Sequence, residues 1–186
     1  IESSTTLGLD DSGTLPSISA FGLTRTPLGA TWVTFPNSNR IHPFGDIAND
    51  LLPTKIYSVS GTPKGIAANR WGRMWVACEG SNYLEKYDSW VRRKIQVSVP
   101  EQPYGVAVDN QQRAWVTHNK MNAEVTIVEN DGTIVGSFDC GGDYARGITF
   151  DINGNAWISL YGAPGIPQGQ VAKVAPDGTL IGNYDV

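Results

Sequence analysis

The side chains able to bind or react are spread along the chain rather than gathered in one motif. Lys64 and Arg146 carry positive charge, and an arginine can hold a carboxylate or phosphate through two parallel hydrogen bonds. Tyr104 offers a ring on which a sugar or another flat ligand can stack. With their neighbours in the repeat described below, these residues make up a candidate ligand-binding set: Lys64, Glu79, Tyr104, His118, Asn119, Arg146 and Tyr161.

The histidines and acidic residues give less support for a catalytic or metal site than the residues above give for ligand binding. Histidine is the commonest general acid or base, but His118 has no evident partner, and a structural or solvent-exposed role is expected for it. The other histidine, His42, lies in a different repeat, and no carboxylates converge with either one, so we expect no metal site. No catalytic residue and no cofactor is predicted. Cys78 and Cys140 are expected to be separate thiols, although pairing cannot be derived from sequence alone.

An internal repeat must position the candidate set. Four tryptophans begin similar short runs, and each follows a glycine by ten residues: Gly22 and Trp32, Gly65 and Trp75, Gly105 and Trp115, Gly147 and Trp157. The glycines recur every 40 to 43 residues. A period of this length with several short strands is typical of a β-propeller blade.

One repeat shows how four strands fit into this period. The apolar run 105–109 ends in an aspartate and a turn, and the tryptophan strand 115–117 follows. A third strand, 123–128, leads through Asp131-Gly132-Thr133, a hairpin signal, into a fourth strand. The recurring Asn69, Asp109 and Asp151 resemble a calcium constellation, but their regular placement favours turn formation.

The repeat predicts one all-β domain over residues 1–186, a β-propeller of four-stranded antiparallel blades. A β-sandwich is the disfavoured alternative, because the same four-strand pattern recurs. We expect a half blade and four whole blades, with these boundaries: 1–18, then 19–62, 63–103, 104–143 and 144–186. The tryptophans are expected to be core wedges between blades. The loops before the first strand and after the second open on one face, which places the candidate set at a channel mouth.

The later repeats resemble a known group of propellers. The segments that carry the resemblance are 103–109 with 114–117, and 154–159 with 171–179. They are similar to the NHL-repeat and streptogramin (virginiamycin B) lyase group, whose fold serves lyases, lactonases and binding proteins. The lyases place an acidic residue after the tryptophan strand and a histidine before the blade glycine. Here those positions hold Phe35, Cys78, His118 and Leu160, and Phe21, Lys64, Tyr104 and Arg146.

Composition narrows the function classes. A net charge of −4 argues against a general nucleic-acid or anionic-membrane binder, and no apolar run is long enough to insert in a membrane. We expect a non-catalytic scaffold or binding module, extracellular or on a particle surface. The alternative is a lyase or lactonase-type enzyme acting at the channel mouth.

The half blade at residues 1–18 has no first half, so the chain is not expected to close into a ring in the ordinary way. Other protein chains, copies of this one among them, are the expected partners that complete or flank the propeller. A missing segment of the same polypeptide would serve as well, and a compact four-bladed ring is the alternative.

Overall fold

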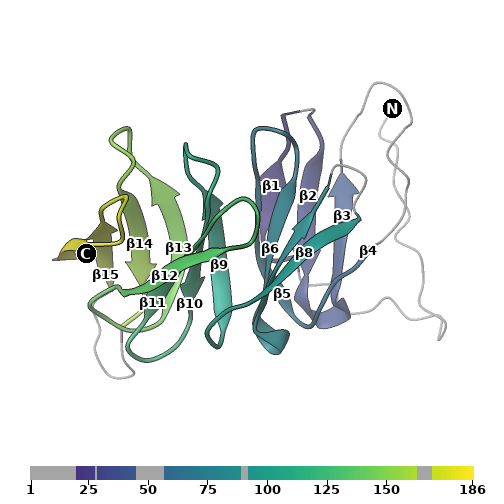
Figure 1. The fold of residues 1–186 in the computed structure, drawn as a ribbon. Coiled ribbons are helices and arrows are strands. Elements are labelled where there is room, and N and C mark those ends of the chain that lie inside the picture. Colours follow the sequence, from purple (N-terminus) through teal and green to yellow (C-terminus); the bar gives the residue numbers. More distant parts are fainter. Residues whose placement is uncertain (1–19, 28, 45–56, 89–91, 163–168) are drawn as a thin grey trace, which may run out of the picture.

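A computed structural model describes residues 20–27, 29–44, 57–88, 92–162 and 169–186, and these form four sheets (Figure 1). The first sheet holds β1 (Leu23–Arg25), β2 (Thr31–Phe35), β3 (Arg40–Phe44) and β4 (Tyr57–Ser58). The second holds β5 (Pro63–Ala68), β6 (Met74–Cys78), β7 (Tyr83–Tyr87) and β8 (Arg93–Ser98). The third holds β9 (Pro103–Val108), β10 (Ala114–His118), β11 (Glu124–Val128) and β12 (Ile134–Asp139). The fourth holds β13 (Ala145–Phe150), β14 (Ala156–Leu160), β15 (Gln170–Val174) and β16 (Leu180–Asp185).

Each sheet is a simple meander in which consecutive strands pair antiparallel. This arrangement confirms the predicted fold class, a propeller of four-stranded antiparallel blades. Short 3₁₀ turns, η1 (Pro36–Ser38) and η2 (Glu79–Ser81), follow the second strands of the first two sheets. The predicted half blade, 1–18, lies outside the described residues.

The first strand of every sheet faces the inside of the arc. β1 lies beside β5, β5 beside β9, and β9 beside β13. The four sheets follow one another from the β1 end to the β13 end (Figure 1). Within the described ranges, the first and fourth sheets share no extended packing, so the described part of the chain is an open arc and not a four-bladed ring.

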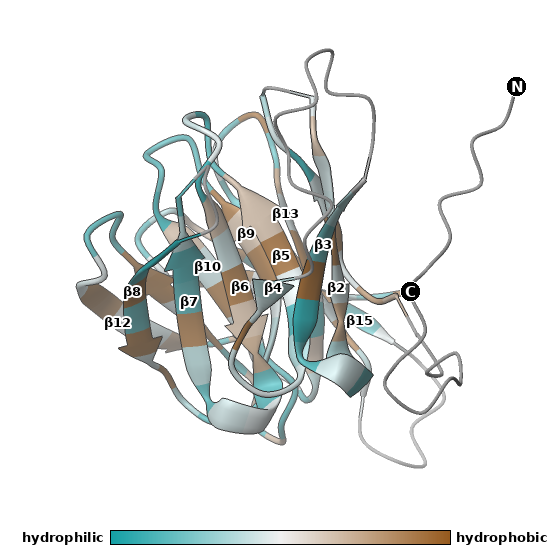
Figure 2. Ribbon diagram, turned by 90° about the vertical axis from the view of Figure 1, so that its right-hand side faces the viewer, coloured by the Kyte–Doolittle hydropathy of each residue, from teal (hydrophilic) through white to brown (hydrophobic). Residues whose placement is uncertain are grey.

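The hydrophobic core is divided into three layers, one between each pair of neighbouring sheets. Trp32, Trp75 and Trp115 are at most 1% exposed, and each shares a layer with apolar residues of the next sheet. Figure 2 shows the corresponding apolar bands along the inner strands, with hydrophilic loops at their ends. The tryptophans therefore hold consecutive blades together, as expected for them. Trp157 has no described sheet beyond it and is only half-buried.

The repeat glycines allow the inner strands to approach closely. A Cβ on Gly65 would lie 2.6 Å from the carbonyl oxygen of Tyr104 on the next inner strand. A Cβ on Gly105 would collide in the same way with the carbonyl oxygen of Arg146. Any side chain at these positions would push neighbouring blades apart, and this explains the glycine in each repeat.

The polar residue that directly follows an inner strand organises the next turn. Asp109 Oδ1 accepts the Arg113 amide at 2.9 Å, and its Oδ2 accepts the Trp115 indole N–H at 3.0 Å. Asp151 binds the Trp157 indole in the same way, at 3.2 Å. These bonds are those of a turn-forming residue, which also fixes the orientation of the core tryptophan.

The second repeat has asparagine, Asn69, where the third and fourth have aspartate. As a result, two buried N–H donors have no hydrogen-bond acceptor. Asn69 Oδ1 accepts the amides of Trp71 and Arg73, both at 3.0 Å. The Asn69 side-chain amide nitrogen and the Trp75 indole nitrogen are buried without a hydrogen-bond partner. A buried unsatisfied donor costs about 1–3 kcal/mol.

Asn69→Asp is expected to stabilise the fold by about 1–2 kcal/mol, because a carboxylate oxygen would accept the Trp75 indole N–H. Lys86 Nζ lies 4.9 Å from the centre of the Trp75 ring, whose indole the new carboxylate would bind. Burial, aided by the positive charge of Arg73, lowers the pKa of Lys86 to about 8, and the new carboxylate should raise it.

Chemical denaturation measures the change, and the matched control is Asp109→Asn, which should lose stability by removing the same bond from the third repeat. A decrease in stability for Asn69→Asp would contradict the assignment.

Candidate functional site

Aromatic and cationic side chains alternate along one end of the inner strands. Phe21, Lys64, Tyr104 and Arg146 directly precede the four repeat glycines, so the repeat places them at equivalent positions. With Tyr161, which follows β14, they form what we call the aromatic–cationic row: Phe21, Lys64, Tyr104, Arg146 and Tyr161.

Ring contacts hold the row together. The Phe21 and Tyr104 rings meet edge to face with centres 5.1 Å apart. Lys64 Nζ lies 4.8 Å from the Phe21 ring centre and 5.4 Å from that of Tyr104. The Arg146 guanidinium carbon lies 5.6 Å from the Tyr104 ring centre and 4.2 Å from that of Tyr161. These are cation–π distances, and they fix two positive charges against three rings.

The two cations differ in their polar partners. Lys64 Nζ forms an ion pair with Glu79 Oε2 at 3.4 Å. Arg146 donates from Nε to Asn119 Oδ1 at 3.0 Å, and no carboxylate in the described ranges pairs with it. The structure thus brings six of the seven predicted residues together, with Arg146 as a cation held by neutral groups.

A groove of about 320 Å³ runs along the inner strands beneath the row. Phe21, Tyr104 and Arg146 line it, together with the repeat glycines and an apolar residue after each of them. Because the glycines lack side chains and the residues after them are apolar, the groove is lined mainly by apolar groups, with the positive charge of Arg146 at its edge. A groove of this kind suits a flat ligand that carries an anionic group.

His118 is placed apart from the row, in the interior. Its side chain is 0% exposed. Nδ1 lies 3.0 Å from the carbonyl oxygen of Glu101, and Nε2 lies 2.8 Å from the hydroxyl of Thr126. Burial lowers the pKa of His118, which favours the neutral ring. These contacts are those of a structural histidine and keep it out of the groove.

Phe21 belongs to the row but was not in the candidate set. The signal for it was present, because Phe21 occupies the same repeat position as Lys64, Tyr104 and Arg146. Repeat position alone would therefore have identified Phe21, whereas its residue type did not suggest ligand binding.

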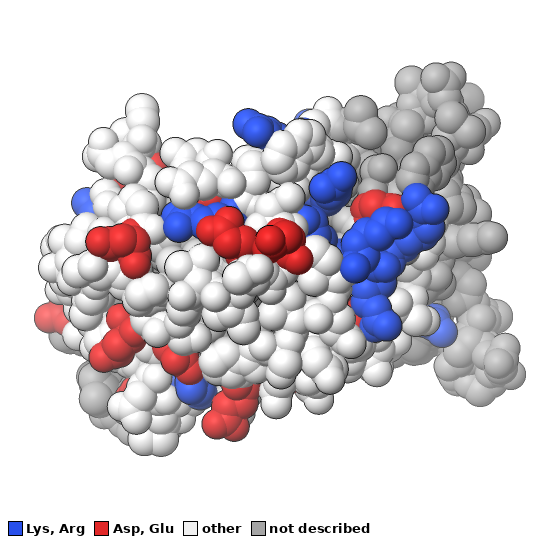
Figure 3. Space-filling view, viewed as in Figure 1, with Lys and Arg blue, Asp and Glu red and all other residues white. Residues whose placement is uncertain are grey.

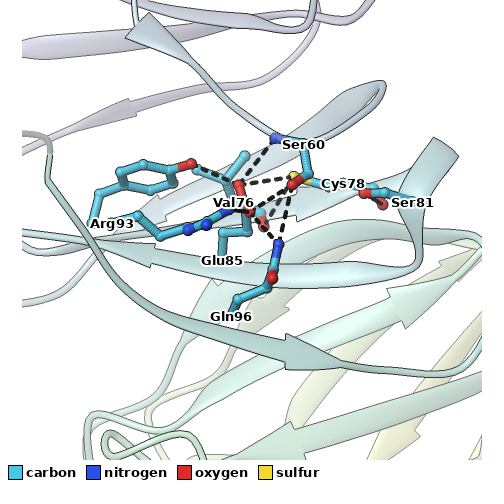
Figure 4. A network of polar contacts seen from close by, with 8 residues as sticks. Ser60, Val76, Cys78, Ser81, Glu85, Arg93 and Gln96 are labelled. Atoms are coloured by element: carbon cyan, nitrogen blue, oxygen red, sulfur yellow. Dashed lines mark hydrogen bonds and ion pairs between the residues drawn. The ribbon is translucent and has the colours of Figure 1, made fainter.

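A second polar cluster lies inside the second blade, around a carboxylate that sequence reasoning missed (Figure 4). Glu85, on β7, is 0% exposed. It accepts hydrogen bonds from the Tyr87 hydroxyl at 2.6 Å, the Ser60 hydroxyl at 2.7 Å and amide at 3.1 Å, and Gln96 Nε2 at 2.8 Å. Arg93 adds an ion pair at 2.9 Å. Ser60 lies between β4 and β5, so the cluster ties the link from the first blade to the second.

These donors determine the charge of Glu85. Burial alone would raise the pKa of its carboxyl, but the hydrogen bonds from Tyr87, Ser60 and Arg93 outweigh it and hold the pKa below its usual value. The carboxylate therefore stays ionised and fully engaged. Burial and the neighbouring carboxylate raise the pKa of Tyr87, which stays protonated and acts as a donor.

The two thiols are separate, as expected for them, and both are buried. Burial raises the pKa of both Cys78 and Cys140, that of Cys140 to about 12, so both stay protonated and unreactive near neutral pH.

Among the described residues, no three histidine, cysteine or acidic side chains gather where they could hold a metal ion. The same residues include no helix of the length and apolar character needed to cross a membrane. Acidic and basic side chains both occur on the face seen in Figure 3.

Glu85→Gln is expected to destabilise the fold at pH 7 by about 3 kcal/mol, because it removes the charge and sets an amide donor against existing donors. The folded-state pKa of Glu85 is lowered, so its contribution is present above the unfolded pKa of about 4.3 and is lost as the pH falls. The difference in free energy of unfolding between the variant and the wild type should therefore be smaller in acid than at pH 7.

Denaturation at pH 7 and in acid measures this effect, with Glu101→Gln, an exposed glutamate, as the control. Equal stability of the Glu85 variant and the wild type at pH 7 would show that the cluster is not needed.

Solved structures with the same fold include two lyases and one synthase. Hydrazine synthase of Kuenenia stuttgartiensis superposes with a TM-score of 0.82 at 14% identity, over 96% of this chain and 53% of the other. Virginiamycin B lyase from Staphylococcus aureus gives 0.76 at 17%, over 96% and 61%. A streptogramin B lyase gives 0.75 at 18%, over 93% and 56%.

This chain therefore spans a little over half the length of these proteins. No protein-family model matches the sequence, and no curated protein sequence matches it. At these identities the likeness concerns the fold, which is the β-propeller that the lyases and the synthase share.

Proposed function

We propose that this propeller is a non-catalytic binding module, and that its aromatic–cationic row binds a flat ligand carrying a carboxylate or phosphate. One observation carries the proposal. Arg146 lies against Tyr104 and Tyr161 at the edge of an apolar groove, with no acidic partner in the described part of the chain.

The contacts of Arg146 suit the binding of an anion. Asn119 engages Nε, and among the described residues the two terminal nitrogens have no hydrogen-bond partner, which leaves them for a ligand. The flanking rings restrict the guanidinium before the ligand arrives. A charge restrained in this way loses little conformational freedom on binding. The groove floor beside it would take the flat part of the ligand.

The structural likeness to lyases favours an enzyme. The contacts of the two acid–base candidates, Glu79 and His118, favour a binding role instead. Glu79 is paired with Lys64, and His118 is buried between a carbonyl and a hydroxyl. Neither is poised to move a proton on a ligand in the groove, because a general base must lie within hydrogen-bond reach of it. Binding is therefore the preferred interpretation. An extracellular or particle-surface location and protein partners remain predictions from the sequence.

Arg146→Gln is expected to weaken binding of phenyl phosphate at least about tenfold, because a charge-assisted pair contributes roughly 1.5–3 kcal/mol. Inorganic phosphate, which lacks the ring, should bind more weakly than phenyl phosphate to the wild type. Titration followed by calorimetry or NMR shifts gives both affinities.

The matched control is Arg70→Gln. Arg70 also stacks on an aromatic ring, with its guanidinium carbon 4.4 Å from the Trp71 ring centre, but it lies in the β5–β6 turn. Equal losses in the two variants would mean that charge alone matters, and the proposal would then be wrong. Chemical change in a streptogramin B incubated with the protein, detected by chromatography, would favour the enzyme instead.

A further inference from the structure

The outer face of the fourth sheet has the residues of an interface but no described partner. In the first and third sheets the same face buries Trp32 and Trp115 to at most 1% exposure, and buries Thr34 and Thr117 completely. In the fourth sheet the equivalent residues, Trp157 and Ser159, are half-buried and exposed. Three more residues on the same face are also half-buried or exposed: Val171, Lys173 and Tyr184. The sheet forms one end of the arc (Figure 1).

A hydroxyl at this face makes a repeated bridge between blades. Thr34 Oγ1 accepts the Gly22 amide of its own blade at 2.8 Å and donates to the Lys64 carbonyl of the next blade at 2.6 Å. Thr117 does the same between the Gly105 amide, at 2.9 Å, and the Arg146 carbonyl, at 2.8 Å. The bridge therefore needs a carbonyl from the following inner strand.

Ser159 holds the same position in the fourth blade and makes half of this bridge. Its Oγ accepts the Gly147 amide at 2.8 Å, and within the described residues its hydroxyl donates to no carbonyl. Gly147 likewise has no described inner strand beside it. A Cβ there would approach only the Ser159 side chain, whereas at Gly65 and Gly105 it would meet the next inner strand. Ser159 and Gly147 are therefore the residue types that, in the preceding blades, contact the inner strand of the next blade.

We infer that this face binds a further propeller blade, whose innermost strand presents a carbonyl to Ser159 and packs apolar side chains on Trp157. The inference is independent of the ligand proposed for the aromatic–cationic row. It commits to the next repeat of the same propeller as the occupant.

The first blade of a second copy fits this face less well. Ala68, Val108 and Phe150, three residues after their repeat glycines, share core layers with the tryptophan of the preceding blade. The Phe150 and Trp115 ring centres, for example, are 5.5 Å apart. The first blade has Arg25 at this position, so a second copy would bring a charged side chain to Trp157. A further repeat also accords with the greater length of the similar structures.

The experiment appends a blade to the 186-residue chain. Val99 and Val186 hold the same place after their outer strands, each donating its amide to a carbonyl, of Asn82 and Gly169 respectively. A copy of residues 100–143 is therefore added directly after Val186. The extended chain should melt at a higher temperature than the original. Ser159→Ala should lower the melting temperature of the extended chain more than that of the original, in which the hydroxyl makes only the bond to the Gly147 amide.

Thr117→Ala is the matched control, since its bridge exists in both chains and its loss should lower both melting temperatures. A second extension, a copy of residues 60–103, guards against a junction that does not fold. If neither extension raises the melting temperature, the inference is overturned. It is also overturned if the original chain forms dimers that Ser159→Ala dissociates, because a second copy would then be the occupant.

Discussion

The close approach of the inner strands is the constraint on which the arc depends. At Gly65 and Gly105 the next strand's carbonyl occupies the space that a side chain would need. The tryptophans can then bridge the gap between sheets, and the hydroxyls of Thr34 and Thr117 can reach the neighbouring blade. A residue with a Cβ at either glycine would separate two sheets and open the core between them.

The same constraint builds the candidate site. Because each repeat glycine must face its neighbour, the residue before it is held at the edge of the groove, once in every blade. Four successive blades can therefore present different side chains at one place without altering the fold. Here that place holds two aromatics and two cations, in alternation. Function at such a site is carried by the identity of these side chains, while the glycines and tryptophans keep them in position.

The repeat was readable from the sequence because its spacing reflects the strand and turn lengths of one blade, and both are local properties. Six of the candidate residues could be grouped for the same reason. The burial of His118 could not be predicted from the sequence, because it depends on contacts with Glu101 and Thr126, which come from other segments of the chain. Glu85 gave no signal either. A glutamate on a strand is ordinarily exposed, and its donors come from Ser60, Tyr87, Arg93 and Gln96, whose convergence only the folded sheets create.

Division of the core into layers has a consequence for the motions of the chain. Each sheet packs on its immediate neighbours, so opening one layer leaves the others intact, and the arc responds as a linear series of coupled units. The second and third sheets each share two layers, and the first and fourth share one each with a described neighbour. Slow hydrogen exchange should accordingly concentrate in β5–β7 and β9–β11, with backbone amides exchanging faster toward the ends of the described arc.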